Sequence, residues 1–196
     1  MKNPNRTARE NRKAETGDSA DTIVVCSGKY GTSLQYAKWL MESLDCDCME
    51  YNKKMLGYVS MYRNVVYIGA VRGGDIHMLN MLWQNYNNFG LDGRNLFICG
   101  VGLGDPDNRT YVDLLRRRNG CENQHNIDFF ILPGRFNKNK LKIMDRSLFS
   151  NFAGGEAQGL YNINDAALIL ERANNNYDGM SRDALYPVIR RILELN

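Results

Sequence analysis

Four short apolar runs recur along the chain, and longer segments of mixed apolar and polar positions separate them. The runs cover residues 22–27, 64–70, 95–101 and 127–132. They are rich in β-branched residues and show no in/out alternation, which is typical of strands buried on both faces of a parallel sheet. A more polar run at residues 46–51 favours a strand nearer the sheet edge.

Between these runs, apolar residues return at spacings of three and four, which predicts amphipathic helices. The predicted helices cover residues 34–44, residues 76–89 with Asp75 as N-cap, residues 111–115, residues 166–173, and residues 185–195 with Pro187 in the first turn. The Asn-rich residues 174–179 predict a loop. Parallel strands joined by helices need right-handed crossovers, so the pattern predicts a three-layer α/β sandwich.

Length and composition are those of a single globular domain. The chain has 196 residues, is 43% hydrophobic, and has no apolar run near the roughly 18 residues of a membrane span. Residues 1–21 contain five Lys/Arg, four Asp/Glu and almost no apolar side chain, unlike a secretory signal or a transit peptide. We therefore expect a disordered tail at residues 1–21, a domain at residues 22–196, and a cytoplasmic location.

The cysteines and histidines predict no metal site. The five cysteines include no Cys-x-x-Cys pair, and the chain has two histidines, His77 and His125. A structural zinc site needs four such ligands at compatible spacings. Cys26 and Cys99 lie inside apolar runs and are interpreted as small buried hydrophobic residues.

A ligand of such a sheet binds beyond the carboxyl ends of the strands, where this chain has three Gly-rich loops. The first loop covers residues 27–33, between a strand and a helix. Its glycines permit a tight turn, Lys29 adds a charge, Thr32 and Ser33 add hydroxyls, and the helix N-terminus attracts anions. The loop therefore predicts a phosphate cradle without Walker A or G-x-G-x-x-G spacing, and the alternative is an ordinary capped turn.

The second and third loops suit a flat ligand. In residues 69–77, Gly73 and Gly74 permit close approach of a planar group, and Arg72 is placed to pair with an anion. The alternative is a turn with a solvated Arg72, and His77 is interpreted as structural. Residues 99–106 have a glycine at every second position, which would let backbone amides line a ring. Its distance from the first strand argues against NAD. One phosphate loop and two Gly-rich loops around a flat pocket favour a mononucleotide such as FMN.

Three segments resemble known proteins. Residues 23–40 resemble the phosphate-loop region of flavodoxin-like proteins. Residues 69–77 and 132–156 resemble the bacterial flavodoxin-type (menaquinone-dependent) protoporphyrinogen dehydrogenase group. The resemblance covers roughly residues 22–156. It implies a flavodoxin-like three-layer α/β/α sandwich, with a five-stranded parallel sheet of order 2-1-3-4-5 and non-covalent FMN.

The resemblance implies cofactor contacts from all three loops, and it identifies no catalytic side chain. The implied contacts are Ser27, Gly28, Lys29, Tyr30, Gly31, Thr32, Ser33, Ala70, Val71, Arg72, Gly73, Gly74, Gly100, Val101, Gly102, Leu103, Gly104 and Asp105. Gly28 departs from the family pattern, which has a hydroxyl there, and a lost hydrogen bond to phosphate costs about 1.5–3 kcal/mol unless Ser27 or water replaces it. The second and third loops contain no Trp or Tyr to stack on the ring; Tyr30, Tyr111 and Trp83 are the nearest in sequence.

The net charge of +3 is unevenly distributed. Arg116–Arg118 adds three positive charges and Arg135–Arg146 a net of four, which leaves a net of −4 elsewhere. Apolar residues interleave with the charges across residues 134–156, so this segment is interpreted as basic and amphipathic. Such a segment can contact an anionic membrane, an anionic small molecule or a protein, or it can be a solvated face. No stacking motif favours nucleic acid.

Three functions remain open from the sequence. The first is an FMN-dependent oxidoreductase of the protoporphyrinogen dehydrogenase type, which passes electrons to a quinone or a redox protein. The basic segment leaves open a peripheral location at the inner face of the membrane. The second is a small electron carrier, although carriers of this type are usually acidic around the flavin. The third is a flavodoxin-fold protein with weak or no flavin binding, which the glycine at position 28 motivates.

Overall fold

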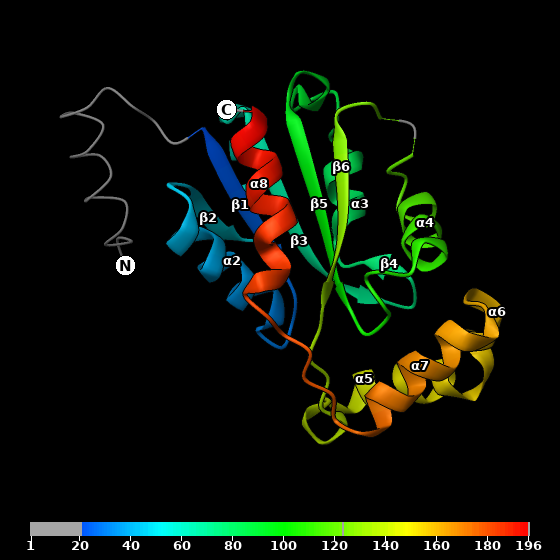
Figure 1. Ribbon diagram of the computed structural model, residues 1–196. Coiled ribbons are helices and arrows are strands. Elements are labelled where there is room, and N and C mark those ends of the chain that lie inside the picture. Colours follow the sequence, from blue (N-terminus) through cyan, green and yellow to red (C-terminus); the bar gives the residue numbers. More distant parts are fainter. Residues whose placement is uncertain (1–20, 123, 196) are drawn as a thin grey trace.

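The computed structural model describes residues 21–122 and 124–195, so the expected tail lies outside the described residues except for Asp21. Its centre is a parallel sheet in the order β2-β1-β3-β5-β6 (Figure 1). The strands are β1 (Thr22–Ser27), β2 (Asp47–Glu50), β3 (Asn64–Arg72), β4 (Asp75–Ile76), β5 (Asn95–Gly102) and β6 (Ile127–Pro133). Counted along the parallel strands this is the order 2-1-3-4-5, which confirms the predicted fold class and topology.

Helices cover both faces of the sheet, and further helices lie at one end of it. They are α2 (Thr32–Ser43), α3 (Leu79–Trp83), α4 (Arg109–Arg118), α5 (Ile143–Asn151), α6 (Ala157–Leu160), α7 (Ile163–Asn174) and α8 (Tyr186–Leu195). Short 3-10 turns are η1 (Leu56–Met61), η2 (Leu91–Gly93), η3 (Lys138–Lys140) and η5 (Asp183–Leu185), and η4 (Phe152–Glu156) is a π-helical turn. None of the described helices is long and apolar enough to span a bilayer.

The central strands are apolar on both sides because each side packs on a separate core. Val24 of β1 and Phe97 of β5 face α2 and α8, together with Leu40 and Val188. The alternate residues, such as Val25 and Ile98, face α3 and η1 on the other side. In a strand, successive side chains point to opposite faces, so an unbroken apolar run is the expected sequence for this position.

The helix predicted at residues 76–89 with Asp75 as its N-cap is confirmed only in part, because α3 covers Leu79–Trp83 alone and its N-cap residue is Met78. β3 continues to Arg72, and a two-residue turn at Gly73 and Gly74, with φ of 54° and 84°, leads into antiparallel β4. A two-residue type I′ hairpin turn needs a positive φ at both central residues, and glycine adopts such values without strain. Asp75 forms an ion pair with Arg118 at 2.8 Å instead of capping a helix.

Residues 135–178 form a long excursion between β6 and α8, here called the insert. The first and last residues of the insert lie side by side and are joined by backbone hydrogen bonds. The Phe136 amide donates to the Tyr177 carbonyl (2.8 Å), and the Gly179 amide donates to the Gly134 carbonyl (3.0 Å). Figure 1 shows its helices α5, α6 and α7 below the end of the sheet where the parallel strands finish. The basic segment expected at residues 134–156 is therefore one part of a larger helical unit.

We predict that Phe97→Ala lowers the free energy of unfolding by about 3–5 kcal/mol, because it removes a fully buried aromatic ring between the sheet and two helices. Leu193→Ala is the control, since Leu193 is 58% exposed, and a change within about 0.5 kcal/mol is expected. Urea unfolding followed by circular dichroism measures both. Equal stability of the two variants would contradict the assignment of this core.

Candidate functional site

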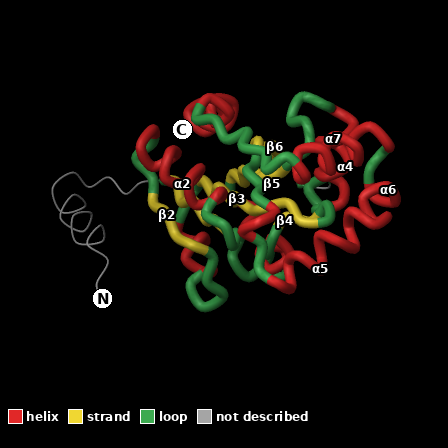
Figure 2. The backbone as a smooth tube through the Cα atoms, turned by 90° about the horizontal axis from the view of Figure 1, so that it is seen from below, coloured by secondary structure: helices red, strands yellow, loops and turns green. Residues whose placement is uncertain are grey.

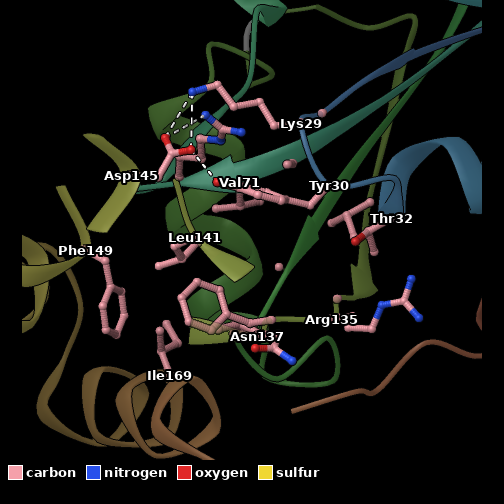
Figure 3. Close-up of a pocket in the computed structure, with 18 of the residues that line it drawn as sticks. Lys29, Tyr30, Thr32, Val71, Arg135, Asn137, Leu141, Asp145, Phe149 and Ile169 are labelled. Atoms are coloured by element: carbon pink, nitrogen blue, oxygen red, sulfur yellow. Dashed lines mark hydrogen bonds and ion pairs between the residues drawn. The ribbon is translucent and has the colours of Figure 1, made fainter. Parts of the chain in front are cut away.

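A pocket of about 560 Å³ lies between the carboxyl ends of the strands and the insert. Figure 2, seen from below, shows α5, α6 and α7 grouped beside that end of the sheet, and Figure 3 shows the pocket itself. Its volume is within the range of small-molecule sites. The pocket brings together twelve of the implied cofactor residues: Gly28, Lys29, Tyr30, Thr32, Ser33, Ala70, Val71, Arg72, Gly73, Val101, Gly102 and Leu103.

The other six implied residues do not line the pocket: Ser27, Gly31, Gly74, Gly100, Gly104 and Asp105. Several of these glycines instead permit contacts within the protein. A Cβ at Gly104 would collide with the ring of Tyr111, and one at Gly100 would lie 3.0 Å from side-chain carbons of Val71 and Ile131. Part of the glycine content of the third loop is therefore required by packing.

The first loop presents hydrogen-bond donors at the start of α2. Gly31 is the N-cap residue at a φ of 81°, and no side chain among the described residues caps this helix. In the described part of the chain, the buried Ser33 hydroxyl has no hydrogen-bond partner. A Cβ at Gly28 would lie 3.1 Å from Ser33 Oγ, so the Ser33 hydroxyl occupies the space that the glycine leaves. An uncapped helix N-terminus with an unsatisfied buried hydroxyl suits an anion.

The Ser27 hydroxyl already has a partner inside the protein. Its Oγ lies 2.7 Å from His77 Nδ1, and Ser27 does not line the pocket. Burial, followed by the nearby charges of Arg72 and Lys29, lowers the pKa of His77, so the imidazole is neutral at pH 7. The Tyr67 hydroxyl donates to the His77 carbonyl at 2.8 Å. These contacts agree with the interpretation of His77 as structural.

Asp145 connects the insert to the first two loops (Figure 3). Its carboxylate accepts hydrogen bonds from Lys29 Nζ at 3.0 Å and from the Tyr30 hydroxyl, and Arg72 Nη1 lies 3.9 Å away. The side chain of Asp145 is only 10% exposed, and the hydrogen bond from Tyr30, then that from Lys29, lowers its pKa. Lys29 and Arg72, which the sequence analysis assigned to an anionic ligand, are therefore paired with a carboxylate of the protein itself.

The insert supplies an aromatic wall that sequence reasoning missed. Phe136, Phe149, Phe152 and Tyr161 line the pocket from the insert, alongside Tyr111 of α4. Tyr111 and Tyr161 have ring centroids 5.6 Å apart. Burial raises the pKa of Tyr161 to about 12, so its hydroxyl is neutral at physiological pH.

Among the three aromatic residues noted from the sequence, Tyr30 and Tyr111 line the pocket and Trp83 does not. The Trp83 indole N–H donates to the Asn119 carbonyl at 2.8 Å, at the helix end behind the sheet. The second and third loops thus line the pocket with glycines, aliphatic side chains and Arg72, and without an aromatic ring. The insert contributes four aromatic rings, and Tyr30 and Tyr111 add two more.

The pocket has an excess of positive charge. Lys29, Arg72, Arg135 and Lys140 line it, against Asp145 and Asp178. Arg135 and Asp178 form an exposed ion pair at 3.4 Å. Arg72 Nη2 is buried and has no hydrogen-bond partner among the described residues. Two unsatisfied buried donors, free helix amides and aromatic walls fit a ligand that has both an anionic group and a flat ring.

These features define a doubly wound α/β protein with its ligand pocket at the carboxyl edge of the sheet. Residues 23–156 match the family model of the flavodoxin domain, so the chain belongs to the flavodoxin domain family. The match ends inside the insert, before α6, α7 and α8. No curated protein sequence matches the chain.

Solved structures of flavodoxins resemble the chain at low sequence identity. A flavodoxin, WrbA-like protein from Agrobacterium tumefaciens is 9% identical, with 81% of this chain and 99% of that chain covered and a TM-score of 0.43. Oxidised flavodoxin 2 from Bacillus cereus is 16% identical, with coverages of 71% and 99% and a TM-score of 0.35. A Fusobacterium nucleatum flavodoxin bound to flavin mononucleotide is 14% identical, with coverages of 43% and 53% and a TM-score of 0.31.

We predict that Asp145→Asn lowers the free energy of unfolding at pH 7 by about 1–2 kcal/mol, since charge-assisted hydrogen bonds weaken and the half-exposed Lys29 is partly screened. The pKa of Asp145 is depressed in the fold, so this stabilisation is present above the unfolded value of about 3.9 and is lost as pH falls through the folded value. Urea unfolding at pH 7 and at about pH 3 should therefore show a difference between the variant and the unaltered chain that is largest at pH 7 and smaller at the lower pH.

Asp92→Asn is the matched control, because it makes the same chemical change at an exposed residue of η2. It should leave the stability unchanged at both pH values. If Asp145→Asn matched this control at pH 7, the bridge between the insert and the first loop would contribute nothing measurable.

Proposed function

We propose that this chain is an FMN-binding redox protein and that the pocket below the sheet is its flavin site. The observation that supports this most directly is the unsatisfied Ser33 hydroxyl at the uncapped start of α2, inside a glycine-rich loop. Membership of the flavodoxin domain family supports the same cofactor. Bound FMN would supply hydride or electron transfer, and the protein supplies binding, orientation and electrostatics.

The residues of the first loop would hold the phosphate. Ser33 offers a hydroxyl that needs an acceptor, Thr32 lines the same pocket, and the first amides of α2 add the positive end of the helix dipole. The flat ring would lie between Ala70–Gly73 and Val101–Leu103, where small side chains and glycines permit close approach. The aromatic residues of the insert line the opposite side.

The aromatic lining of the pocket favours an oxidoreductase with an organic substrate over a small electron carrier. A carrier exchanges electrons with protein partners at an exposed flavin edge, whereas here Phe136, Phe149 and Phe152 of the insert line the pocket opposite the loops. The positive charge of the pocket also differs from the acidic surround that is usual for carriers of this type. A redox titration separates the two, because a carrier takes up single electrons and this proposal expects a two-electron change.

The narrower proposal is an activity of the protoporphyrinogen dehydrogenase type, with a quinone or a redox protein as electron acceptor. It is supported by the resemblance of residues 69–77 and 132–156 to that group. Arg135 and Lys140 line the pocket and would pair with the carboxylates of such a substrate. Neither residue is in the first loop, so the flavin proposal does not depend on this one.

A second candidate is a flavodoxin-fold protein that binds flavin weakly. The specific observation in its favour is Asp145, whose carboxylate already pairs with Lys29 and lies near Arg72. An anionic ligand that needed these cations would have to displace an internal carboxylate. Visible flavin absorption in protein purified with added FMN would dispose of this candidate.

We predict that Ser33→Ala weakens FMN binding about 10- to 100-fold, which corresponds to one hydrogen bond to a charged group, about 1.5–3 kcal/mol. Thr32→Ala should change the affinity in the same direction. Quenching of flavin fluorescence on titration measures the dissociation constant. Ser43→Ala is the control, since Ser43 is exposed in the last turn of the same helix and should leave the affinity unchanged. Equal affinities for Ser33→Ala and Ser43→Ala would mean that the phosphate site is misassigned.

We predict that protoporphyrinogen bleaches the visible flavin absorption of the FMN-loaded protein under anaerobic conditions. Arg135→Gln should slow bleaching at low substrate concentration by about ten-fold, through loss of one charge-assisted contact. The control is Arg182→Gln, because Arg182 pairs with Glu42 at 3.0 Å and is not part of the pocket lining. If the flavin stays oxidised, the substrate proposal fails and the cofactor proposal stands.

A further inference from the structure

We infer that the outer face of α5 docks on an anionic lipid membrane. The surface, here called the α5 surface, combines exposed residues of α5 with exposed residues of the segment before it. Its apolar side chains are Ile143, Met144 and Leu148, and its basic ones are Lys138, Lys140, Lys142 and Arg146. Lys138 lies over the Phe149 ring, 5.7 Å from its centroid, and Lys140 also lines the pocket. The docking does not depend on bound flavin. Its use to the protein rests on the proposed function.

The apolar part of the α5 surface is unusually exposed for side chains of this kind. Ile143 is 86% exposed, Met144 78% and Leu148 63%. Met144 and Leu148 are four residues apart and therefore lie next to each other on the helix, whereas Ile143 points about 100° round the helix from Met144. Apolar side chains grouped in this way on one helix face mark an interaction site more than isolated ones do.

The charge of the α5 surface is entirely positive because the fold turns its one acid inward. Asp145 is the single acidic residue between Arg135 and Arg146, and it faces Lys29 and Tyr30 from the inner side of α5. In the described part of the chain, no carboxylate forms an ion pair with Lys138, Lys142 or Arg146. Arg146 instead donates to the backbone carbonyls of Leu141 and Asn139, and its side chain stays exposed.

Charge complementarity selects an anionic bilayer as the partner. Basic side chains beside exposed apolar ones are the arrangement of interfacial segments, in which the charges meet lipid headgroups and the apolar groups enter the acyl boundary. A second copy of the chain would bring the same positive charges together, which disfavours self-association through this face. Figure 1 places α5, together with α6 and α7, at the end of the molecule opposite the C-terminus of α8.

The position of α5 links docking to the pocket. The inner side of the same helix contributes Asp145 and Phe149 to the pocket wall, and Leu148 belongs to both the wall and the outer face. A single helix therefore separates the docked surface from the ligand space. An apolar substrate or a quinone dissolved in the bilayer would be concentrated beside this wall.

Sedimentation with lipid vesicles tests the inference on the full chain. We expect binding to vesicles of equimolar phosphatidylglycerol and phosphatidylcholine at low salt, weaker binding as salt rises, and little binding to phosphatidylcholine alone. The double variant Ile143→Ser/Met144→Ser should bind about ten-fold more weakly, because it removes apolar groups that enter the lipid. Lys138→Gln/Lys142→Gln should bind more weakly and depend less on salt.

Met61→Ser/Leu193→Ser is the matched control, since these side chains are 69% and 58% exposed far from α5, and its binding should equal that of the unaltered chain. The inference is overturned if the chain binds equally well to vesicles with and without phosphatidylglycerol. It is also overturned if Ile143→Ser/Met144→Ser and Lys138→Gln/Lys142→Gln both bind as well as the unaltered chain. So does analytical ultracentrifugation in which the unaltered chain is a dimer and Ile143→Ser/Met144→Ser a monomer, because the face is then an interface between copies. Vesicle binding is measured without flavin, so its failure leaves the proposed function untouched.

Discussion

The contact of Asp145 with Lys29, Tyr30 and Arg72 is the interaction on which the geometry of the pocket depends. It joins residues more than a hundred positions apart, from the first loop to α5. The Lys142 amide adds a bond of 3.2 Å to the Tyr30 hydroxyl. In the described part of the chain, no other hydrogen bond or ion pair joins the insert to the first loop. A nearly buried carboxylate with several donors is well suited to this task, because removing either side would leave an unpaired charge.

The far end of the insert is fixed by backbone groups. Arg172 of α7 donates to the carbonyls of Leu103 and Gly104 at 2.7 and 3.0 Å, so the third loop and the insert form one unit. Gly134 passes so close to Gly102 that a Cβ there would lie 2.7 Å from the Gly102 carbonyl oxygen. Only glycine fits at that crossing. Both ends of the insert are thereby held against loops that line the pocket, which gives the aromatic wall a defined position.

The parts of this architecture that could be predicted are those that local sequence determines. Buried strands such as residues 95–101 need continuous apolar residues, so their runs predicted the sheet and its order. The Gly73–Gly74 hairpin was missed because the same residues also suit a turn before a helix, and the pairing of β4 with β3 is decided by tertiary contacts such as that of Ile76 with Asn119. Asp145 and Tyr161 reach the pocket only through folding of the insert, and no local pattern specifies that. The lone acid within Arg135–Arg146 was the one available signal.

The two sides of α5 explain how one basic segment serves a pocket and a surface without conflict. Asp145 neutralises cations on the inner side, where an excess of positive charge at low dielectric would be costly. The cradle at the start of α2 then relies on the Ser33 hydroxyl and on helix amides, which are neutral donors and need no counter-ion in the absence of ligand. On the outer side, the loss of the same acid from the surface leaves Lys142 and Arg146 unopposed. Because the Asp145 carboxylate points inward, it sets the charge of both faces of α5. The selectivity of the pocket for an anion then rests mainly on directional hydrogen bonds.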